Sequence, residues 1–242
     1  MSDPYAPAQR HGELEEPLPG VFFVTGSLAM NAAMRFSRNM TIVREGERLI
    51  LVNTLRLSAV GLAALDALGK VTDVVRLAGF HGMDDRFYKD RYGAKVWAIR
   101  GQRYTKAFDT KGPSYFEPDV EVGPGDALPL EGASLHVFSC TPPEAILVLQ
   151  RHGGIAITGD SLQNWAKTDR YFSLPAKVAM KLMGFIKPRN IGPGWAKAAK
   201  PAAAELRAVL DLDFEHLLPA HGEAVLGGAK ASYRPVIEAF GR

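Results

Sequence analysis

The chain has 242 residues, of which 47% are hydrophobic and 23% are charged, and its formal net charge is +3. This length is enough for one large domain with a full hydrophobic core or for two small ones. The slight positive charge does not by itself indicate nucleic-acid binding, and we expect no nucleic-acid partner. The single cysteine, Cys140, excludes an internal disulfide and favours a cytoplasmic location.

The N-terminal residues 1–18 are polar and contain several prolines. We expect them to form a loose tail ahead of a single domain that covers residues 19–242. The tail lacks the apolar stretch of a signal peptide, and no apolar run of the chain approaches the ~20 residues that a membrane span needs. We therefore expect no stable insertion into a membrane.

The first half of the domain alternates short apolar runs with two helical segments. Strands are predicted over 21–25, 40–43, 48–52, 71–78 and 95–99, and helices over 59–68 and 87–92. The runs 40–43 and 48–52 are separated by Glu45-Gly46-Glu47, which predicts a hairpin.

The second half begins with three apolar runs, over 134–138, 145–150 and 154–158, which predict adjacent antiparallel strands. Helices are then predicted over 174–186, 202–212 and 229–240, and a strand over 217–219. Strands and helices are mixed in both halves, and no long polar linker divides them. This pattern favours one α/β domain in which helices cover two mixed sheets.

Three short segments place carboxylate or imidazole groups just after a predicted strand. They span residues 78–86, 158–160 and 219–222. Strand ends hold side chains rigidly, and histidine with carboxylate is a common ligand set for zinc, iron or manganese. Each segment alone is more typical of a turn or of a structural histidine. Their joint occurrence favours a shared site.

The order of these segments resembles the metallo-β-lactamase superfamily, from about Val21 to the C-terminus. The stretches GIAITGDSL and FEHLLPAHGEAV are the most specific parts, because they are similar to the last two metal motifs of that family. The resemblance implies a four-layer αββα sandwich of two mixed sheets. It is greatest to an uncharacterised branch in which the first metal motif is degenerate.

The first family motif, HxHxDH, falls on residues 81–86. His81 and Asp85 match it, whereas Met83 and Arg86 stand where histidines are expected. A register with Asp84 as the motif aspartate stays open. The middle histidine of the family is also absent, and Thr141 or Glu144 takes its place.

By this resemblance, Asp85, Asp160 and His221 are the predicted metal ligands, with His81 as an additional candidate. Three protein ligands and a water form a complete catalytic set for one ion, so we expect at most one zinc or iron ion, or none. The predicted catalytic residues are His81, Asp85 and Arg86. The predicted ligand pocket consists of Met83, Asp84, Thr141, Glu144 and Trp165.

Two functions remain open from the sequence. The first is a metal-dependent hydrolase that acts on a small-molecule substrate. The second is a non-catalytic pseudoenzyme that binds a small anionic or apolar ligand in the former cleft. Arg86 distinguishes them, because a guanidinium that entered the site would pair with Asp85 or Asp160 in place of a cation.

The segment 167–200 carries eight basic residues opposed only by Asp169. Its helix, predicted over 174–186, has a broad apolar face that most simply packs on the core. The alternative is a lid over the site, or a surface that attracts an anionic ligand or a membrane.

Overall fold

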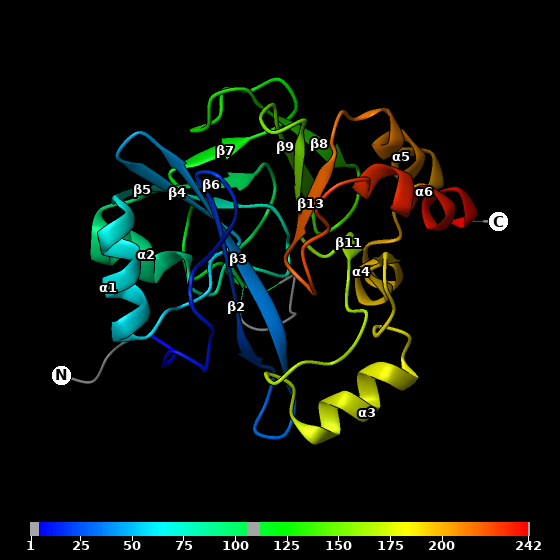
Figure 1. Cartoon of the computed structure of the whole chain (residues 1–242), viewed down its shortest axis with the longest axis horizontal. Helices are drawn as coiled ribbons and strands as arrows, with labels where there is room; N and C mark the ends of the chain where they lie inside the picture. Colours follow the sequence, from blue (N-terminus) through cyan, green and yellow to red (C-terminus); the bar gives the residue numbers. More distant parts are fainter. Residues whose placement is uncertain (1–4, 106–111, 242) are drawn as a thin grey trace.

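A computed structural model describes residues 5–105 and 112–241. Two β-sheets lie face to face at its centre, and helices cover the outer face of each (Figure 1). The larger sheet has seven strands in the order β1 to β7. Their bounds are β1 Glu15–Leu18, β2 Val21–Ala29, β3 Arg35–Glu45, β4 Arg48–Val52, β5 Lys70–Arg76, β6 Lys95–Ile99 and β7 Val120–Val122. Strands β1 to β4 pair antiparallel and β4 to β7 pair parallel, so this sheet is mixed.

The second sheet has four strands in the order β13-β10-β9-β8. Their bounds are β8 Ala133–Phe138, β9 Glu144–Leu149, β10 Ile155–Thr158 and β13 His216–Pro219. Strands β8, β9 and β10 are antiparallel neighbours, as the sequence predicts, and β13 joins β10 in parallel. A short pair, β11 Leu162–Gln163 and β12 Asn190–Ile191, lies beside this sheet.

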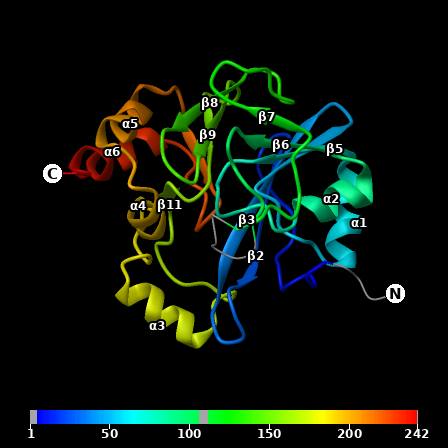
Figure 2. The same ribbon diagram turned by 180° about the vertical axis from the view of Figure 1, so that it is seen from behind.

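Helices α1 Ala59–Leu68 and α2 Asp85–Tyr92 pack on the seven-stranded sheet. Helices α4 Pro193–Ala199, α5 Ala203–Ala208 and α6 Ala229–Ala239 lie on the side of the four-stranded sheet, as the view from behind also shows (Figure 2). A 3₁₀ turn over Val209–Asp211 follows α5. Helix α3, Leu174–Leu182, lies at one end of the molecule, next to the β2–β3 hairpin at the bottom of Figure 1. Among the described residues, no helix is long and apolar enough to cross a membrane.

The four layers follow from the two-residue period of the strands, since successive side chains of a strand point to opposite faces. In β4, Leu49 and Leu51 pack toward α1 and α2, whereas Ile50 and Val52 pack between the sheets. Strand β9 shows the same alternation between the central core and the side of α4 to α6. The predicted αββα arrangement is thereby confirmed.

The structure differs from the sequence prediction at several elements, among them the N-terminal tail and helix α3. The predicted loose tail is ordered in its last part, because β1 pairs with β2 and the N–H of Gly12 donates to the carbonyl of Thr25 (2.8 Å). Residues 1–4 lie outside the described residues. Helix α3 ends at Leu182 and not at residue 186. Gly184 follows its C-cap with φ +78°, a left-handed conformation that stops a helix.

Asn53 joins the two sheets at the edge where β4, β5 and β10 end. Its side-chain amide donates to the carbonyl of Thr158 (3.0 Å), and its side-chain oxygen accepts from the N–H of Leu77 (3.2 Å). The N–H of Ala145 donates to the carbonyl of Leu77 (3.0 Å) at the same place. These bonds hold the ends of strands from both sheets together.

Candidate metal centre

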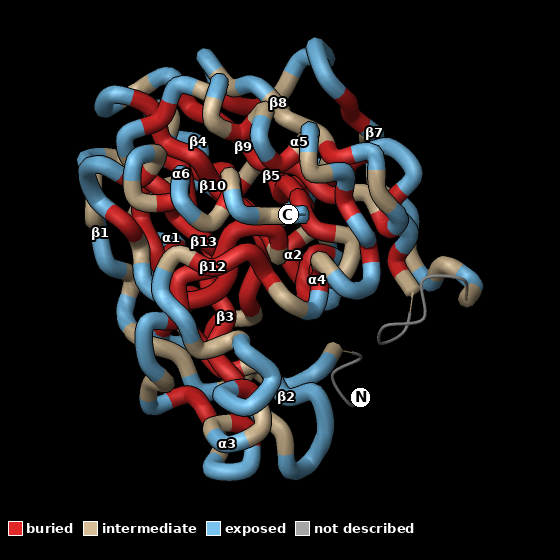
Figure 3. The backbone as a smooth tube through the Cα atoms, turned by 90° about the vertical axis from the view of Figure 1, so that its right-hand side faces the viewer, coloured by how far each residue is buried: buried red, intermediate tan, exposed pale blue. Residues whose placement is uncertain are grey.

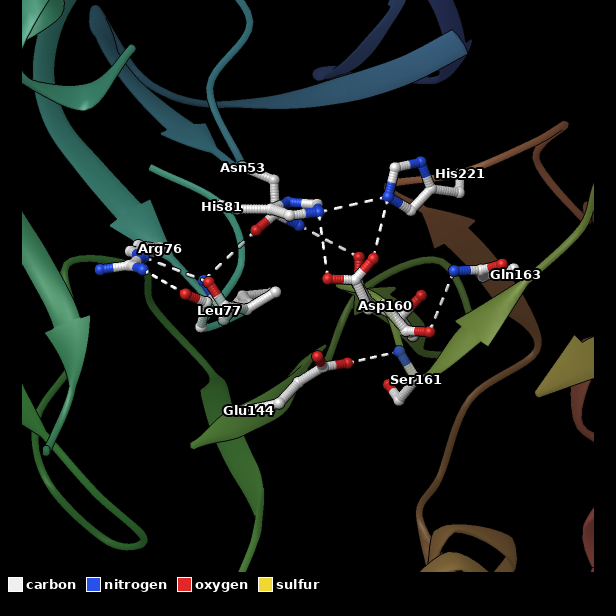
Figure 4. A network of polar contacts seen from close by, with 12 residues as sticks. Asn53, Arg76, Leu77, His81, Glu144, Asp160, Ser161, Gln163 and His221 are labelled. Carbon is white, nitrogen blue, oxygen red and sulfur yellow. Dashed lines mark hydrogen bonds and ion pairs between the residues drawn. The ribbon is translucent and has the colours of Figure 1, made fainter. Parts of the chain in front are cut away.

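Three side chains meet at this edge, and they come from three different strand ends. His81 lies in the loop after β5, Asp160 follows β10, and His221 follows β13 (Figure 4). The Nε2 atoms of the two histidines are 3.2 Å apart. Oxygens of Asp160 lie 3.3 Å from Nε2 of His81 and 3.0 Å from Nε2 of His221. One ligand atom from each residue lies within 4.8 Å of the other two, which is close enough for all three to bind one ion.

The loop that carries His81 is fixed by Arg76, the last residue of β5. The buried guanidinium of Arg76 donates to the carbonyl oxygens of Ala78 (3.1 Å) and Gly79 (2.6 Å). Gly82 follows His81 with φ +97°, and a Cβ at this position would lie 2.7 Å from the ring of Tyr104. Only glycine fits such a close approach in this conformation.

His221 is positioned in a similar way from β3. The side-chain amide of Asn39 donates to the carbonyls of Pro219 (2.8 Å) and Gly222 (2.6 Å), on either side of the histidine. Gly222 has φ +95°, and a Cβ there would overlap the backbone of Asn164. Nδ1 of His221 lies 3.3 Å from the carbonyl oxygen of Ser37. A proton on Nδ1 would therefore leave the lone pair of Nε2 directed at the shared site.

Burial and close contact shift the pKa values of the carboxyl and of one imidazole in the cluster. Burial raises the pKa of the Asp160 carboxyl, but the facing imidazoles of His81 and His221 outweigh it, and the pKa lies well below its ordinary value. Burial also lowers the pKa of His81, and Asp160 offsets this only in part. A carboxylate beside an unprotonated imidazole is the state that a metal ion requires.

One carboxylate oxygen of Asp160 accepts no hydrogen bond. Oδ2 of Asp160 is buried and has no hydrogen-bond donor with suitable geometry among the described residues, although Nε2 of His81 is near it. A buried oxygen without a donor is costly unless something else satisfies it. The donor set and the orphaned oxygen both fit a divalent cation.

Glu144, at the start of β9, is fully buried below this cluster. Burial raises the pKa of its carboxyl well above the usual range, and the nearby charge of Asp160 raises it further. Its Oε1 accepts a hydrogen bond from the N–H of Ser161, whereas Oε2 has no partner among the described residues. The pKa values of the two carboxyls are therefore shifted in opposite directions, down for Asp160 and up for Glu144.

The structure does not bring Asp85 into the cluster. As the first residue of α2, Asp85 is fully buried, and it accepts from the hydroxyls of Thr54 (2.5 Å) and Tyr104 (2.6 Å). Both of its oxygens are occupied by these donors, so the predicted grouping of Asp85 with Asp160 and His221 is replaced by one that contains His81.

Arg86 also lies outside the site. Its side chain is 52% exposed and pairs with Asp90 one helical turn later (3.4 Å), so the predicted alternative in which it pairs with Asp85 or Asp160 is wrong. The buried ion pair in this region is formed by Arg38 of β3 and Asp84, whose carboxylate also accepts from the N–H of Arg56 (3.0 Å).

The remaining predicted pocket residues are dispersed. Met83 is half exposed, and Thr141 is exposed in the loop before β9. Trp165 is buried against His221, with ring centroids 4.8 Å apart, and its indole N–H donates to the hydroxyl of Ser37 (2.9 Å). Cys140 is half-buried, and burial raises the pKa of its thiol to about 11, which keeps it protonated at neutral pH.

Sequence reasoning missed the residues of β3 that support the site. Ser37, Arg38 and Asn39 are all buried, and each contacts a segment that carries or adjoins a cluster residue. The available signal was three consecutive polar residues directly before an apolar strand run. Buried polar residues of this kind need partners, and here the partners are the loops of the site.

Comparison with solved structures identifies the architecture. The structure of FIM-1 from Pseudomonas aeruginosa, a metallo-β-lactamase in its mono-zinc form, covers 96% of this chain and 96% of its own, with a TM-score of 0.63 and 14% identity. A metallo-β-lactamase from Erythrobacter litoralis is also similar, with a TM-score of 0.56 and 15% identity over 95% of this chain and 94% of its own. One from Hirschia baltica has a TM-score of 0.56 and 16% identity over 93% of this chain and 96% of its own. The chain has the metallo-β-lactamase fold.

Sequence comparison gives no closer assignment, because neither a protein-family model nor a curated protein matches the chain. In the metallo-β-lactamase fold adopted here, His81 and His221 are 140 residues apart in the chain and lie in loops beside different sheets. The resemblance deduced from short motifs thus agrees with the fold over nearly the whole chain.

Arg38 and Arg86 allow a matched test of how much a buried and an exposed ion pair contribute to stability. Replacing Arg38 with alanine leaves Asp84 buried without its partner, and we expect it to lower the free energy of unfolding by about 3–5 kcal/mol. Replacing Arg86 with alanine removes only a surface ion pair and should change the free energy of unfolding by less than about 0.5 kcal/mol. Urea denaturation of both variants measures the difference, and equal losses would contradict the placement of the two side chains.

Glu144 predicts a pH-dependent difference in stability. Because its folded pKa is raised, its contribution is complete below the ordinary value of 4.5 and is lost as pH rises through the folded pKa. The variant Glu144→Gln does not titrate there, so it should gain stability relative to the native chain as pH rises. Glu144→Ala should lose about 1–3 kcal/mol more than Glu144→Gln, since the N–H of Ser161 loses its acceptor. If the free energies of unfolding of the native chain and of Glu144→Gln differ by the same amount at every pH from acid to neutral, the raised pKa of Glu144 is refuted.

Proposed function

We propose that this protein is a mononuclear metal-dependent hydrolase of small molecules. The observation that supports this most strongly is the convergence of His81, Asp160 and His221 on one point. Two imidazoles and one carboxylate, with a fourth position left for water, are a recurrent catalytic zinc set. The mono-zinc form of FIM-1 supports the idea that one ion is sufficient for this fold to hold zinc.

The proposed ligands are His81, Asp160 and His221. Zinc held by them would act as a Lewis acid and would activate water for attack on a carbonyl or similar centre. The proposed set differs from that expected from sequence, because His81 takes the place of Asp85. A second ion has no comparable set of ligands among the described residues, since Asp84 and Asp85 already have buried partners.

The chain's own groups support this chemistry in three ways. The carbonyl of Ser37 orients the ring of His221, and the rings of Trp165 and Phe36 shield that imidazole on its apolar side. The positive charge of Arg38 also lowers the pKa of His81 and helps to keep this imidazole unprotonated. Electrostatic interactions are stronger in such a buried environment than in water.

In the alternative, a pseudoenzyme that binds a small anionic or apolar ligand in the old cleft, positive charge for an anionic ligand would come from Arg86 and from the basic segment 167–200. Arg86 does not provide it, and Arg38 is already paired with Asp84. The carboxylate oxygen of Asp160 that accepts no hydrogen bond, and has only the imidazole of His81 near it, favours a cation over an anion at this point.

Zinc binding tests the proposal directly. We expect one equivalent of zinc per chain after dialysis, and at least about a hundredfold weaker binding for His81→Ala, Asp160→Asn and His221→Ala, because each removes a ligand. His152→Ala, which removes an exposed histidine, is the matched control and should bind zinc normally. Competition with a chromophoric chelator gives the affinities.

Asp85→Asn separates this ligand set from the one predicted by the motif alone, and it should retain zinc. Hydrolysis of a panel of esters, thioesters and lactams by the zinc-loaded protein then tests catalysis. Two tightly bound equivalents, or zinc binding that survives all three ligand variants, would contradict the mononuclear site. Zinc binding without hydrolysis of any panel member would favour the non-catalytic alternative.

A further inference from the structure

Helix α3 exposes a row of apolar side chains. Leu174, Val178 and Leu182 are four residues apart and therefore share one face of the helix, where they are 77%, 63% and 83% exposed. The opposite face, with Ala176 and Met180, is buried against an aromatic cluster. The helix is thus apolar on two sides, and only one of them is covered by the protein.

The exposed apolar side chains of this protein are concentrated at this end. Nine large apolar side chains are exposed among the described residues. Five of them belong to α3, its C-cap and the β2–β3 hairpin, namely Met30, Leu174, Val178, Leu182 and Met183. Isolated apolar residues on a surface are ordinary, whereas a group of this kind indicates an interaction surface.

The hairpin and the helix are joined into one unit. The hydroxyl of Ser173, the N-cap residue of α3, donates to the carbonyl of Ala33 (2.6 Å) and accepts from the N–H of Arg35 (3.1 Å). The N–H of Ser173 donates to the carbonyl of Arg35 (2.9 Å). Figure 3 shows that α3 and the neighbouring hairpin extend away from the buried strands as a largely exposed projection.

The chain segment that forms this projection is rich in positive charge. No Asp or Glu occurs from residue 170 to residue 204, a stretch that holds seven basic residues. On α3, half-buried Lys177 and exposed Lys181 lie beside the apolar row, and exposed Lys187 follows the helix. None of these three lysines has an ion-pair partner among the described residues.

We propose that α3 and the tip of the β2–β3 hairpin dock on the surface of an anionic membrane. An apolar row flanked by lysines is the arrangement by which interfacial helices bury their apolar side chains between lipids while their charges contact anionic headgroups. A second copy of the chain fits this surface less well, because it would bring two sets of unpaired lysines together. Helix α3 does not span the bilayer, so the docking is peripheral.

Docking would place the metal centre near the lipid surface. The buried face of α3 packs on Trp165 and Phe36, and both rings contact the imidazole of His221. Membrane binding is nevertheless independent of the proposed hydrolase function, because it is measured without metal or turnover.

Co-sedimentation of the full chain with vesicles tests the proposal. We expect binding to vesicles of equal parts phosphatidylglycerol and phosphatidylcholine, much weaker binding to pure phosphatidylcholine, and release as salt rises. The double variant L174Q/L182Q should bind at least about tenfold more weakly, since two leucines no longer enter the lipid. K177Q/K181Q should lose roughly fivefold for each lysine.

Two control variants distinguish binding through this surface from non-specific binding to vesicles. Val60→Gln removes an apolar side chain that is 82% exposed on α1, and Lys70→Gln removes an exposed charge at the start of β5. Both should bind vesicles like the native chain, and circular dichroism checks that all variants fold. Equal binding to neutral vesicles, loss of binding in the controls, or a dimer in solution that L174Q/L182Q dissociates would overturn the proposal.

Discussion

The structure depends on joining the ends of strands from two different sheets at one edge. His81 follows a strand of the larger sheet, whereas Asp160 and His221 follow parallel neighbours of the smaller one. Asn53 bonds to both sides of this junction, and without such ties the sheets would be held together only by non-directional apolar contact. Directional bonds at the edge therefore fix the distance between the two imidazoles.

A second constraint is that charge is buried at this edge. Two imidazoles lower the pKa of Asp160, burial raises the pKa of Glu144 nearby, and Arg38 is paired with Asp84 a short distance away. Burying a charged group costs desolvation free energy, and only a well-placed hydrogen-bond or ion-pair partner offsets that cost. One buried oxygen of Asp160 still lacks such a partner, and this is the physical reason to place a cation there.

The architecture could be predicted from the sequence. So could the loops that carry Asp160 and His221, two of the three residues of the cluster. Short apolar runs revealed the strands, and the Gly-Asp and Ala-His-Gly turns directly follow β10 and β13, so their side chains had to lie at a strand end. His81 was predicted only as an additional ligand. The architecture was predicted correctly because each strand and turn depends on residues that are close together in the chain.

The segment from Asp84 to Arg86 could not be resolved in the same way. In a helix, successive residues point about 100° apart, so neighbouring side chains there reach different partners. Asp84 meets Arg38 and Asp85 meets Tyr104, which are distant in sequence, and Arg86 points to solvent. A linear motif contains no information about which partner is present, so the direction of each side chain became clear only from the fold.

The central claim is that His81, Asp160 and His221 bind one metal ion. The most direct measurement is a crystal structure of the zinc-soaked protein with anomalous data collected at the zinc edge. We predict one strong anomalous peak among these three residues, with ligand distances of about 2.0–2.2 Å. A structure in which this position has no peak, or in which zinc is bound by Asp84 or Asp85, would contradict the account.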